Sequence, residues 1–244
     1  MGPISYLLCT FEYGADQEMR ALSFNAANAH IAGYKARHMT QHPYKITIDP
    51  KRAPTPAHIT YPVDGFMWKD EHQGPLKRTN NPLDVAVKGP GLITLTDGTY
   101  TRNGKMILTP EGILTTPSGH EIAGLTGETL QMTGNIQDLR IMRNGQIINS
   151  NNETLGQIQL TEFDEHDNLK KIGENRIDGS EAGPRPAQQT FMLQGFYEES
   201  NVRLQKTMAK AHGVVTNHHQ AILMNKEHYR SLDDLRNHLV QINA

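Results

Sequence analysis

The feature of this sequence that most limits its fold is a regular stripe of mainly apolar residues near the C-terminus. Between residues 204 and 239 the spacing of the stripe alternates between four and three. Such spacing predicts one long helix, about 54 Å in length at roughly 1.5 Å per residue, with a narrow seam along one face. Ser200 or Asn201 is a suitable N-cap. The stripe consists of Leu204, Met208, Ala211, Val215, His218, Ile222, Asn225, Tyr229, Leu232, Arg236 and Leu239.

A helix of this length cannot bury its seam alone, so it needs a second helix from this chain's N-terminal end or from a neighbouring copy. The N-terminal end has similar spacing and predicts a helix that stops near Gly33. Polar residues within the two stripes, Asn25, His218 and Asn225, are expected to set register and partner choice. The apolar seam of the C-terminal helix is Leu204, Met208, Val215, Ile222, Tyr229 and Leu232, and the N-terminal stripe is Ile4, Leu8, Phe11, Ala15, Glu18, Leu22, Asn25 and Ala29.

The middle of the chain predicts strands and turns. Six prolines between residues 36 and 75 disfavour helix and predict an extended connector with short strand pieces, such as residues 44–48. From residue 76 to about 180, short apolar runs alternate with turn pairs, which predicts an antiparallel β domain. The turn pairs are Asp97-Gly98, Asn103-Gly104, Glu111-Gly112, Ser118-Gly119 and Asn144-Gly145.

The predicted fold class is therefore α+β. Long N- and C-terminal helices, paired as in a coiled coil, accompany a central, mainly antiparallel β domain. The predicted divisions are the N-terminal helix (1–35), the Pro-rich connector (36–75), the β domain (76–190) and the C-terminal helix (191–244).

Composition narrows the classes of function. Of the 244 residues, 24 are basic and 26 are acidic, so no basic excess indicates nucleic-acid binding. No apolar run is long enough to suggest membrane insertion, and the N-terminus lacks the positive region of a secretory signal. By ordinary secretion rules the expected location is the cytoplasm. A single cysteine, Cys9, excludes an internal disulfide and is expected to be a small apolar helix residue.

Candidate chemical sites are weak, and no cofactor is expected. Lys88 lies beside a glycine-rich turn, but a strand pattern follows where a phosphate-binding loop would need a helix, so we expect a solvated hairpin residue. The acidic segment "FDEHDN" (163–168) lacks the spacing of a calcium loop and is expected to be a charged turn. No GxSxG elbow or HExxH motif is present. The histidines, including His212, His218, His219, His228 and His238, are expected to be polar surface residues without metal.

Three segments carry motifs in a fixed order, and we call them the signature segments. The first, residues 24–35, fits the pattern NNLANxNTPGYK at Asn25, Ala27, Asn28, Gly33, Tyr34 and Lys35. The second, residues 74–115, matches a longer pattern at Gly74, Leu76, Thr79, Pro82, Leu83, Asp84, Val85, Ala86, Gly89, Gly91, Tyr100, Thr101, Arg102, Gly104, Gly112 and Leu114. The third, residues 193–221, resembles a pattern beginning GxLExSNV, with Glu199, Ser200, Asn201, Val202 and Met208 assigned to it.

Together these segments resemble the bacterial flagellar basal-body rod and hook proteins. The resemblance implies a structural, non-enzymatic subunit whose terminal helices form an inner tube with the β domain outside. Its implied partners are other rod proteins, its own copies in a helical tube, and the flagellar export apparatus. The implied location is the periplasmic rod of the basal body, reached without a cleaved signal peptide.

Within that family, the chain length and single β domain are most similar to the proximal rod members. The alternatives are a distal rod or hook paralogue, a secreted β-domain binding module, and a metal-dependent hydrolase that uses histidines. The chain departs from the family pattern at several positions, some of which are expected to contact other subunits. These departures are Phe24, Ala26, Ile31, Ala32, Leu92-Ile93 and the segment 217–220.

Overall fold

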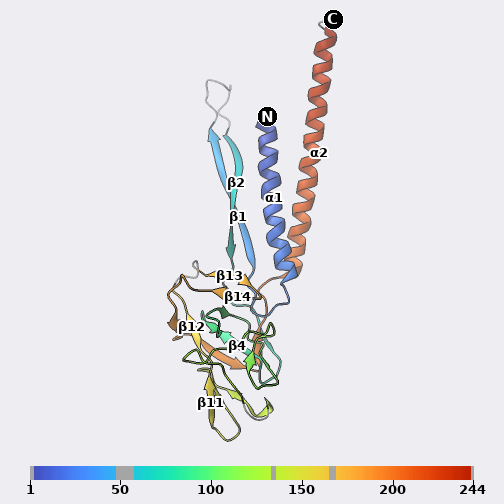
Figure 1. The fold of residues 1–244 in the computed structure, drawn as a ribbon. Coiled ribbons are helices and arrows are strands. Elements are labelled where there is room, and N and C mark those ends of the chain that lie inside the picture. The colour runs from blue at the N-terminus through green and yellow to red at the C-terminus, as the bar shows by residue number, and fades with distance from the viewer. Residues whose placement is uncertain (1–2, 48–57, 133–135, 165–168, 243–244) are drawn as a thin grey trace. The chain divides into compact units, whose positions relative to one another are not determined.

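The computed structural model describes residues 3–47, 58–132, 136–164 and 169–242 (Figure 1). The chain divides into two compact units, each assembled from segments that are distant in sequence. The first unit contains residues 1–27, 37–70 and 203–244, and the second contains residues 28–36 and 71–202.

The first unit combines two helices with a long hairpin. Helix α1 spans Pro3–Ala27, helix α2 spans Leu204–Ile242, and strands β1 (Arg37–Thr47) and β2 (His58–Lys69) pair antiparallel. The Pro-rich stretch thus forms two long strands, where the sequence predicts an extended connector with short strand pieces. Pro43 lies opposite Pro62 in this ribbon. Proline is tolerated here because half of the N–H groups of a two-stranded ribbon point away from the partner strand.

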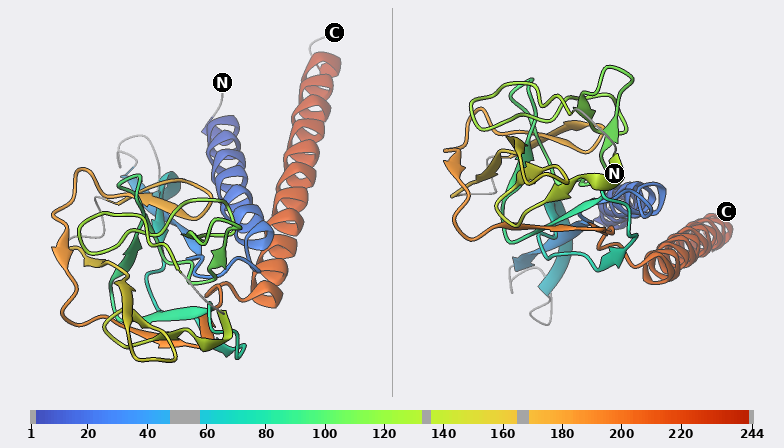
Figure 2. Two further views of the ribbon diagram at one scale, coloured as in Figure 1. Left: turned by 60° about the horizontal axis from the view of Figure 1, so that its bottom comes forward. Right: turned by 90° about the horizontal axis from the view of Figure 1, so that it is seen from below.

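The two helices differ from the predicted long pair. Helix α1 has 25 residues and ends at Ala27, before the expected stop at Gly33, whereas α2 has 39 residues. Helix α1 contacts α2 and both strands of the hairpin. Figures 1 and 2 show that the helices lie closest where α1 ends and α2 begins, and that they diverge from there. A continuous coiled-coil pairing therefore stays a prediction.

The predicted N-caps of α2 have other roles in the structure. The Ser200 hydroxyl accepts a hydrogen bond from Val202 N (3.2 Å), and Asn201 Oδ1 accepts one from Ala36 N (2.7 Å). Helix α2 begins only at Leu204. Both residues thus bond within the second unit, upstream of the helix.

The second unit is built from short strands, and every strand pairing recorded in the described residues is antiparallel. This confirms the predicted mainly antiparallel β domain. The strands are β3 (Leu76–Arg78), β4 (Val85–Lys88), β5 (Leu92–Thr94), β6 (Tyr100–Thr101), β7 (Ile107–Leu108), β8 (Leu114–Thr115), β9 (Arg140–Ile141), β10 (Gln146–Ile148), β11 (Thr154–Gln157), β12 (Leu160–Glu162), β13 (Lys170–Gly173), β14 (Arg176–Asp178), β15 (Arg185–Pro186), β16 (Phe191–Gln194) and β17 (Phe196–Glu198), with a short 3-10 helix η1 (Ile136–Asp138).

These strands form one six-stranded sheet, one three-stranded sheet and several pairs. The six-stranded sheet has the order β13-β14-β6-β5-β12-β15, and the three-stranded sheet has the order β11-β10-β9. Strand β16 pairs with β4 and β17 with β3, so the end of the unit returns beside its beginning. The main core is a cluster of buried apolar side chains that includes Val85, Val87, Ile93, Leu95 and Ile122, and a smaller cluster contains Leu92, Phe163 and Ile177.

The glycines of the predicted turn pairs divide into two kinds. Gly98, Gly112, Gly119 and Gly145 have positive φ values between 79° and 87°, as tight turns require. Gly104 is different, because a Cβ there would overlap Val85 O, so this glycine allows two backbone segments to approach closely. Within the described residues, no helix combines the length and apolarity needed to cross a membrane.

Candidate functional site

The central feature of the second unit is a buried carboxylate, Glu198, which is 1% exposed. Its oxygens accept hydrogen bonds from Lys35 Nζ (2.7 Å), Arg102 Nε (2.8 Å) and Gly74 N (2.9 Å). Lys35 and Arg102 are themselves almost fully buried. We call Lys35, Arg102 and Glu198 the Glu198 cluster. One member comes from each of the three signature segments, so the cluster joins parts of the chain that are far apart in sequence.

The remaining donors of the two cations bind backbone carbonyls. Arg102 donates from Nη1 to Gly91 O (2.6 Å) and from Nη2 to Val87 O (3.0 Å). Lys35 Nζ also donates to His72 O (2.7 Å). The two cations exceed the single carboxylate by one charge, and these carbonyl dipoles take up the excess. The buried charges of the site are therefore well satisfied by hydrogen bonds.

The electrostatics keep Glu198 ionised. Burial by itself raises the pKa of the Glu198 carboxyl, but Arg102 and Lys35 outweigh this effect and hold the pKa below its ordinary value of 4.5. A buried charge is tolerated only when it is paired and hydrogen-bonded, and Glu198 meets both conditions.

The backbone around the cluster is closely packed. Gly33 has φ +68° and donates from N to Glu198 O (2.8 Å). A Cβ at Gly33 would lie 2.6 Å from Arg102 O, so the position requires glycine for both conformation and space. Asn201 links the third signature segment to Tyr34 and His72. Asn201 N donates to Tyr34 O (3.3 Å), and Asn201 Nδ2 donates to His72 O (3.1 Å).

The second signature segment supports the same region through its glycines. Gly91 N donates to Thr190 Oγ1 (2.8 Å), and a Cβ at Gly91 would collide with that side chain. Gly89 has φ +113° and packs against the backbone of Gln189. These contacts hold the turn between β4 and β5 against the segment before β16. Gly91 O is thereby placed within hydrogen-bond distance of Arg102 Nη1.

Other residues of the second segment have structural roles. Leu83 belongs to the aliphatic core, and Pro82 O accepts a hydrogen bond from Gln194 Nε2 (2.9 Å). Asp84 O accepts one from Gly195 N (2.8 Å). The Tyr100 ring packs edge-on against Phe163, with ring centroids 4.8 Å apart. None of these contacts suggests chemistry, and all of them stabilise the fold.

The start of the first signature segment belongs to the first unit. Asn25 is buried, and its side-chain amide makes two hydrogen bonds to the Arg37 backbone. Asn25 Nδ2 donates to Arg37 O (2.6 Å), and Arg37 N donates to Asn25 Oδ1 (2.8 Å). Asn25 thus fixes the first residue of β1 against the last turns of α1. Ala27 ends the helix, and Asn28 O accepts a turn hydrogen bond from Ile31 N (3.1 Å).

Sequence reasoning missed Glu198 and assigned its motif position to Glu199. Glu199 is partly exposed and pairs with Lys77 at 3.4 Å on the surface. In the pattern GxLExSNV the glutamate stands two residues before Ser-Asn, which is the position of Glu198 in "GFYEESNV". Counting from Gly195 would have found it.

The predicted seam of α2 separates into two columns. Leu204, Ala211, His218 and Asn225 are partly buried. The alternate column of large apolar residues is between 45% and 58% exposed. It consists of Met208, Val215, Ile222 and Tyr229. Leu232, seven residues after Asn225, continues the first column and is also exposed. The stripe is therefore only half covered within the described part of this chain.

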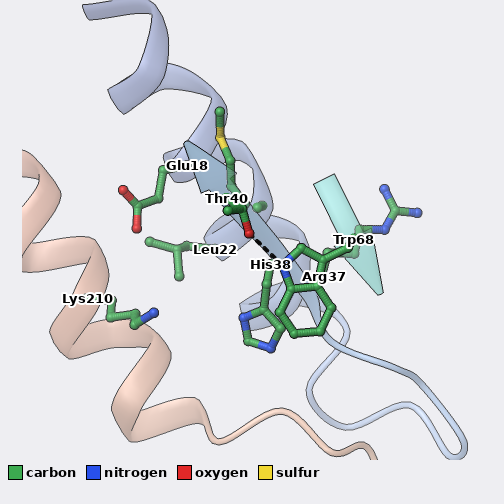
Figure 3. A pocket seen from close by; sticks show the side chains of 9 residues that line it. Glu18, Leu22, Arg37, His38, Thr40, Trp68 and Lys210 are labelled. Carbon is green, nitrogen blue, oxygen red and sulfur yellow. Dashed lines mark hydrogen bonds between the residues drawn. The ribbon is translucent and has the colours of Figure 1, made fainter. Parts of the chain in front are cut away.

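A small polar cavity lies in the first unit between α1, the hairpin and α2 (Figure 3). Glu18, His38 and Lys210 line it, and the Trp68 indole donates to Thr40 Oγ1 (2.9 Å) at its edge. Its volume is about 170 Å³. Small-molecule sites usually have roughly 300–1,000 Å³, so we assign no ligand to it.

The structure also places the other residues that the sequence offered as candidate phosphate or metal sites. Lys88 is exposed at the end of β4, and a strand follows its loop. His212 and His219 are exposed and His218 is partly buried on α2. In the described part of the chain, no group of three His, Cys, Asp or Glu side chains is placed to hold a metal ion. Residues 165–168 of the acidic segment lie outside the described residues, as do the side chains of Cys9, His228 and His238.

The Glu198 cluster thus ties the three signature segments together inside an α+β fold. No protein-family model matches the chain. It is 26% identical over 211 residues to the flagellar basal-body rod protein FlgF of Rhizobium meliloti (strain 1021), with 84% of each chain covered. A FlgF protein of Caulobacter vibrioides is 25% identical over 77% of each chain.

A second rod protein is also similar. FlgG of Buchnera aphidicola subsp. Schizaphis graminum is 32% identical over 148 residues, which cover 54% of this chain and 55% of FlgG. The chain is therefore a homologue of the flagellar basal-body rod proteins FlgF and FlgG.

Proposed function

We propose that the protein is a structural, non-enzymatic subunit of the bacterial flagellar basal-body rod. The observation that carries this proposal is the similarity to FlgF along 84% of both chains. The FlgF match over 84% of each chain favours the proximal rod. FlgG relatives align over as many as 212 residues, so the distal rod is an alternative position, as is the hook.

The half-covered stripe of α2 supports assembly through helices. Its exposed column, from Met208 to Tyr229, is an apolar surface whose contact with water is unfavourable. Terminal helices of neighbouring subunits would cover this column by packing side by side around an axial channel. Contacts of this head-to-tail kind do not close into a ring and generate a helical tube.

The Glu198 cluster suits a part that carries load. The second unit consists of residues 28–36 and 71–202. Within it, Gly33 N donates to Glu198 O and Ala36 N donates to Asn201 Oδ1. The short segment 28–36 is therefore fastened to the end of the β domain by hydrogen bonds and by the ion pairs of the Glu198 cluster, which suits a subunit that has to transmit torque.

We further propose that the subunit leaves the cytoplasm through the flagellar export apparatus, without a cleaved signal peptide, and assembles in the periplasm. Export through a narrow channel requires an unfolded chain, and the marginal stability of ordinary domains, about 5–15 kcal/mol, permits it. Deleting the export apparatus should trap the protein inside the cell, and unchanged export would contradict this route.

The assembly proposal can be tested by placing charge on the exposed column. Val215→Glu combined with Ile222→Glu should leave the isolated chain folded, because both side chains are already about half exposed. The same variant should abolish rod formation and swimming. A matched control is Thr216→Glu combined with Gln220→Glu, which adds the same charge at exposed polar positions of α2. Normal swimming of the Val215/Ile222 variant would refute helix packing through this column.

A further inference from the structure

A second surface of the β unit has the character of a binding groove. It has a volume of about 470 Å³. This lies within the range of roughly 300–1,000 Å³ that is usual for ligand sites. The floor is formed by Ile158 and Leu160, which are buried. The rest of the lining is Leu125, Arg143, Asn144, Gln157, Pro186, Ala187, Gln188, Thr190 and Phe191.

The charge of the groove is one-sided. Its lining includes Arg143 and no carboxylate. The Arg143 guanidinium lies 5.6 Å from the centroid of the Phe191 ring, and the Lys88 ammonium lies 5.5 Å from the same centroid. Within the described residues, no Asp or Glu forms an ion pair with either cation. The groove is thus a cationic and apolar surface on a chain whose net charge is −2.

Glu162 does not line the groove but fixes a loop that does. Its Oε1 accepts hydrogen bonds from Gln188 N (3.2 Å), Gln189 N (2.9 Å) and Thr190 Oγ1 (2.6 Å). Because Glu162 holds the loop 188–190 in place, one wall of the groove is fixed before any ligand arrives. Preformed sites of this kind lose little entropy on binding.

The apolar part of the groove is accessible. Leu125 is 56% exposed at its rim, and the Phe191 ring is partly exposed close to Arg143 and Lys88. An apolar group next to a negative charge suits this surface, because the group covers exposed apolar atoms while the charge pairs with arginine. A neutral sugar would leave both cations without a counter-charge.

We propose that this groove docks an extended, acidic peptide segment of a partner protein. An apolar side chain of the peptide rests on Leu125 and Phe191, and a neighbouring carboxylate pairs with Arg143. Charge complementarity selects the peptide. None of the lining residues belongs to the Glu198 cluster, and the inference does not rest on the proposed place of the protein in the rod.

The test is a titration of the isotopically labelled full chain with two synthetic peptides, followed by amide chemical shifts. The acidic probe is acetyl-DLDLDL-amide and the basic probe is acetyl-KLKLKL-amide. The acidic peptide should produce saturable shifts at residues 143–144, 157–160 and 187–191, and the basic peptide should produce none. Arg143→Glu should weaken binding of the acidic peptide at least about tenfold, which is the loss of one charged pair.

A matched control separates the groove from the general charge of this face. Arg140 is also exposed, lies three residues away on β9 and does not line the groove. Arg140→Glu should change the affinity less than about twofold. Equal weakening by both variants would overturn the proposal in favour of a long-range field. Absence of saturable shifts would overturn it as well, as would binding of the neutral sugar chitotriose at the same amides without binding of the acidic peptide. A failed titration leaves the rod proposal unaffected, since motility and basal-body assembly test that separately.

Discussion

Replacing Glu198 by glutamine is the most informative change to the β unit. The substitution preserves the shape of the side chain and an oxygen that can still accept from Gly74 N. It removes the carboxylate that accepts hydrogen bonds from Lys35 Nζ and Arg102 Nε, at 2.7 and 2.8 Å. Both cations are 7% exposed, so water cannot replace the lost charge.

The expected cost follows from this burial. Removing one partner of a buried ion pair typically costs about 3–5 kcal/mol, because the remaining charge stays buried and unpaired. Whole domains are stable by about 5–15 kcal/mol, so Glu198→Gln should remove a large fraction of the stability. For a unit of this size, the loss corresponds to a fall in Tm of roughly 10–15 °C.

Differential scanning calorimetry of the full chain measures this change, and Glu199→Gln is the matched control. Glu199 is the adjacent residue and makes only a surface ion pair with Lys77, which contributes little. Calorimetry should show a large fall in Tm for Glu198→Gln and almost none for Glu199→Gln. A similar small effect for both variants would refute the view that the Glu198 cluster holds the unit together.

Two further predictions concern the same region. The folded-state pKa of Glu198 lies below its ordinary value, so its stabilising effect is complete above pH 4.5 and is lost as the pH falls through the lowered pKa. The difference in unfolding free energy between the native chain and Glu198→Gln should therefore narrow on acidification from pH 7 to pH 3 in urea titrations, and a constant difference would contradict the assignment. Gly33→Ala should destabilise the chain by about 2–4 kcal/mol, because a strained φ is combined with a collision against Arg102 O. Gly98→Ala, with φ +79° and open space around it, should cost only about 1–2 kcal/mol, and equal losses in chemical denaturation would show that the collision is relieved.

Much of the β unit could be predicted from local sequence. Glycines with positive φ closed the turns at Gly98, Gly112, Gly119 and Gly145, since turn chemistry is a property of two or three adjacent residues. The antiparallel class followed from the short spacing between these turns. Gly104 could not be separated from the turn glycines, because its role depends on the distant Val85 backbone.

The parts that sequence reasoning missed depend on long-range contacts. The six prolines between residues 36 and 75 suggested a connector, but only strand pairing reveals that two of them, Pro43 and Pro62, lie opposite one another in a hairpin. The stripe of apolar residues continues past Ala27, which predicted a longer N-terminal helix. Helix α1 ends at Ala27 because the residues that follow belong to the second unit and form hydrogen bonds there. The Glu198 cluster joins positions separated by 163 and 96 residues, and no local pattern encodes such distances.

The most direct test of the proposed function is cryo-electron microscopy of basal bodies isolated from the bacterium that carries this gene. At side-chain resolution, density for this chain should be found in the proximal rod, with Val215 and Ile222 buried against helices of adjacent subunits. A complete rod reconstruction in which no subunit fits this sequence, or in which these two side chains face water, would contradict the assignment.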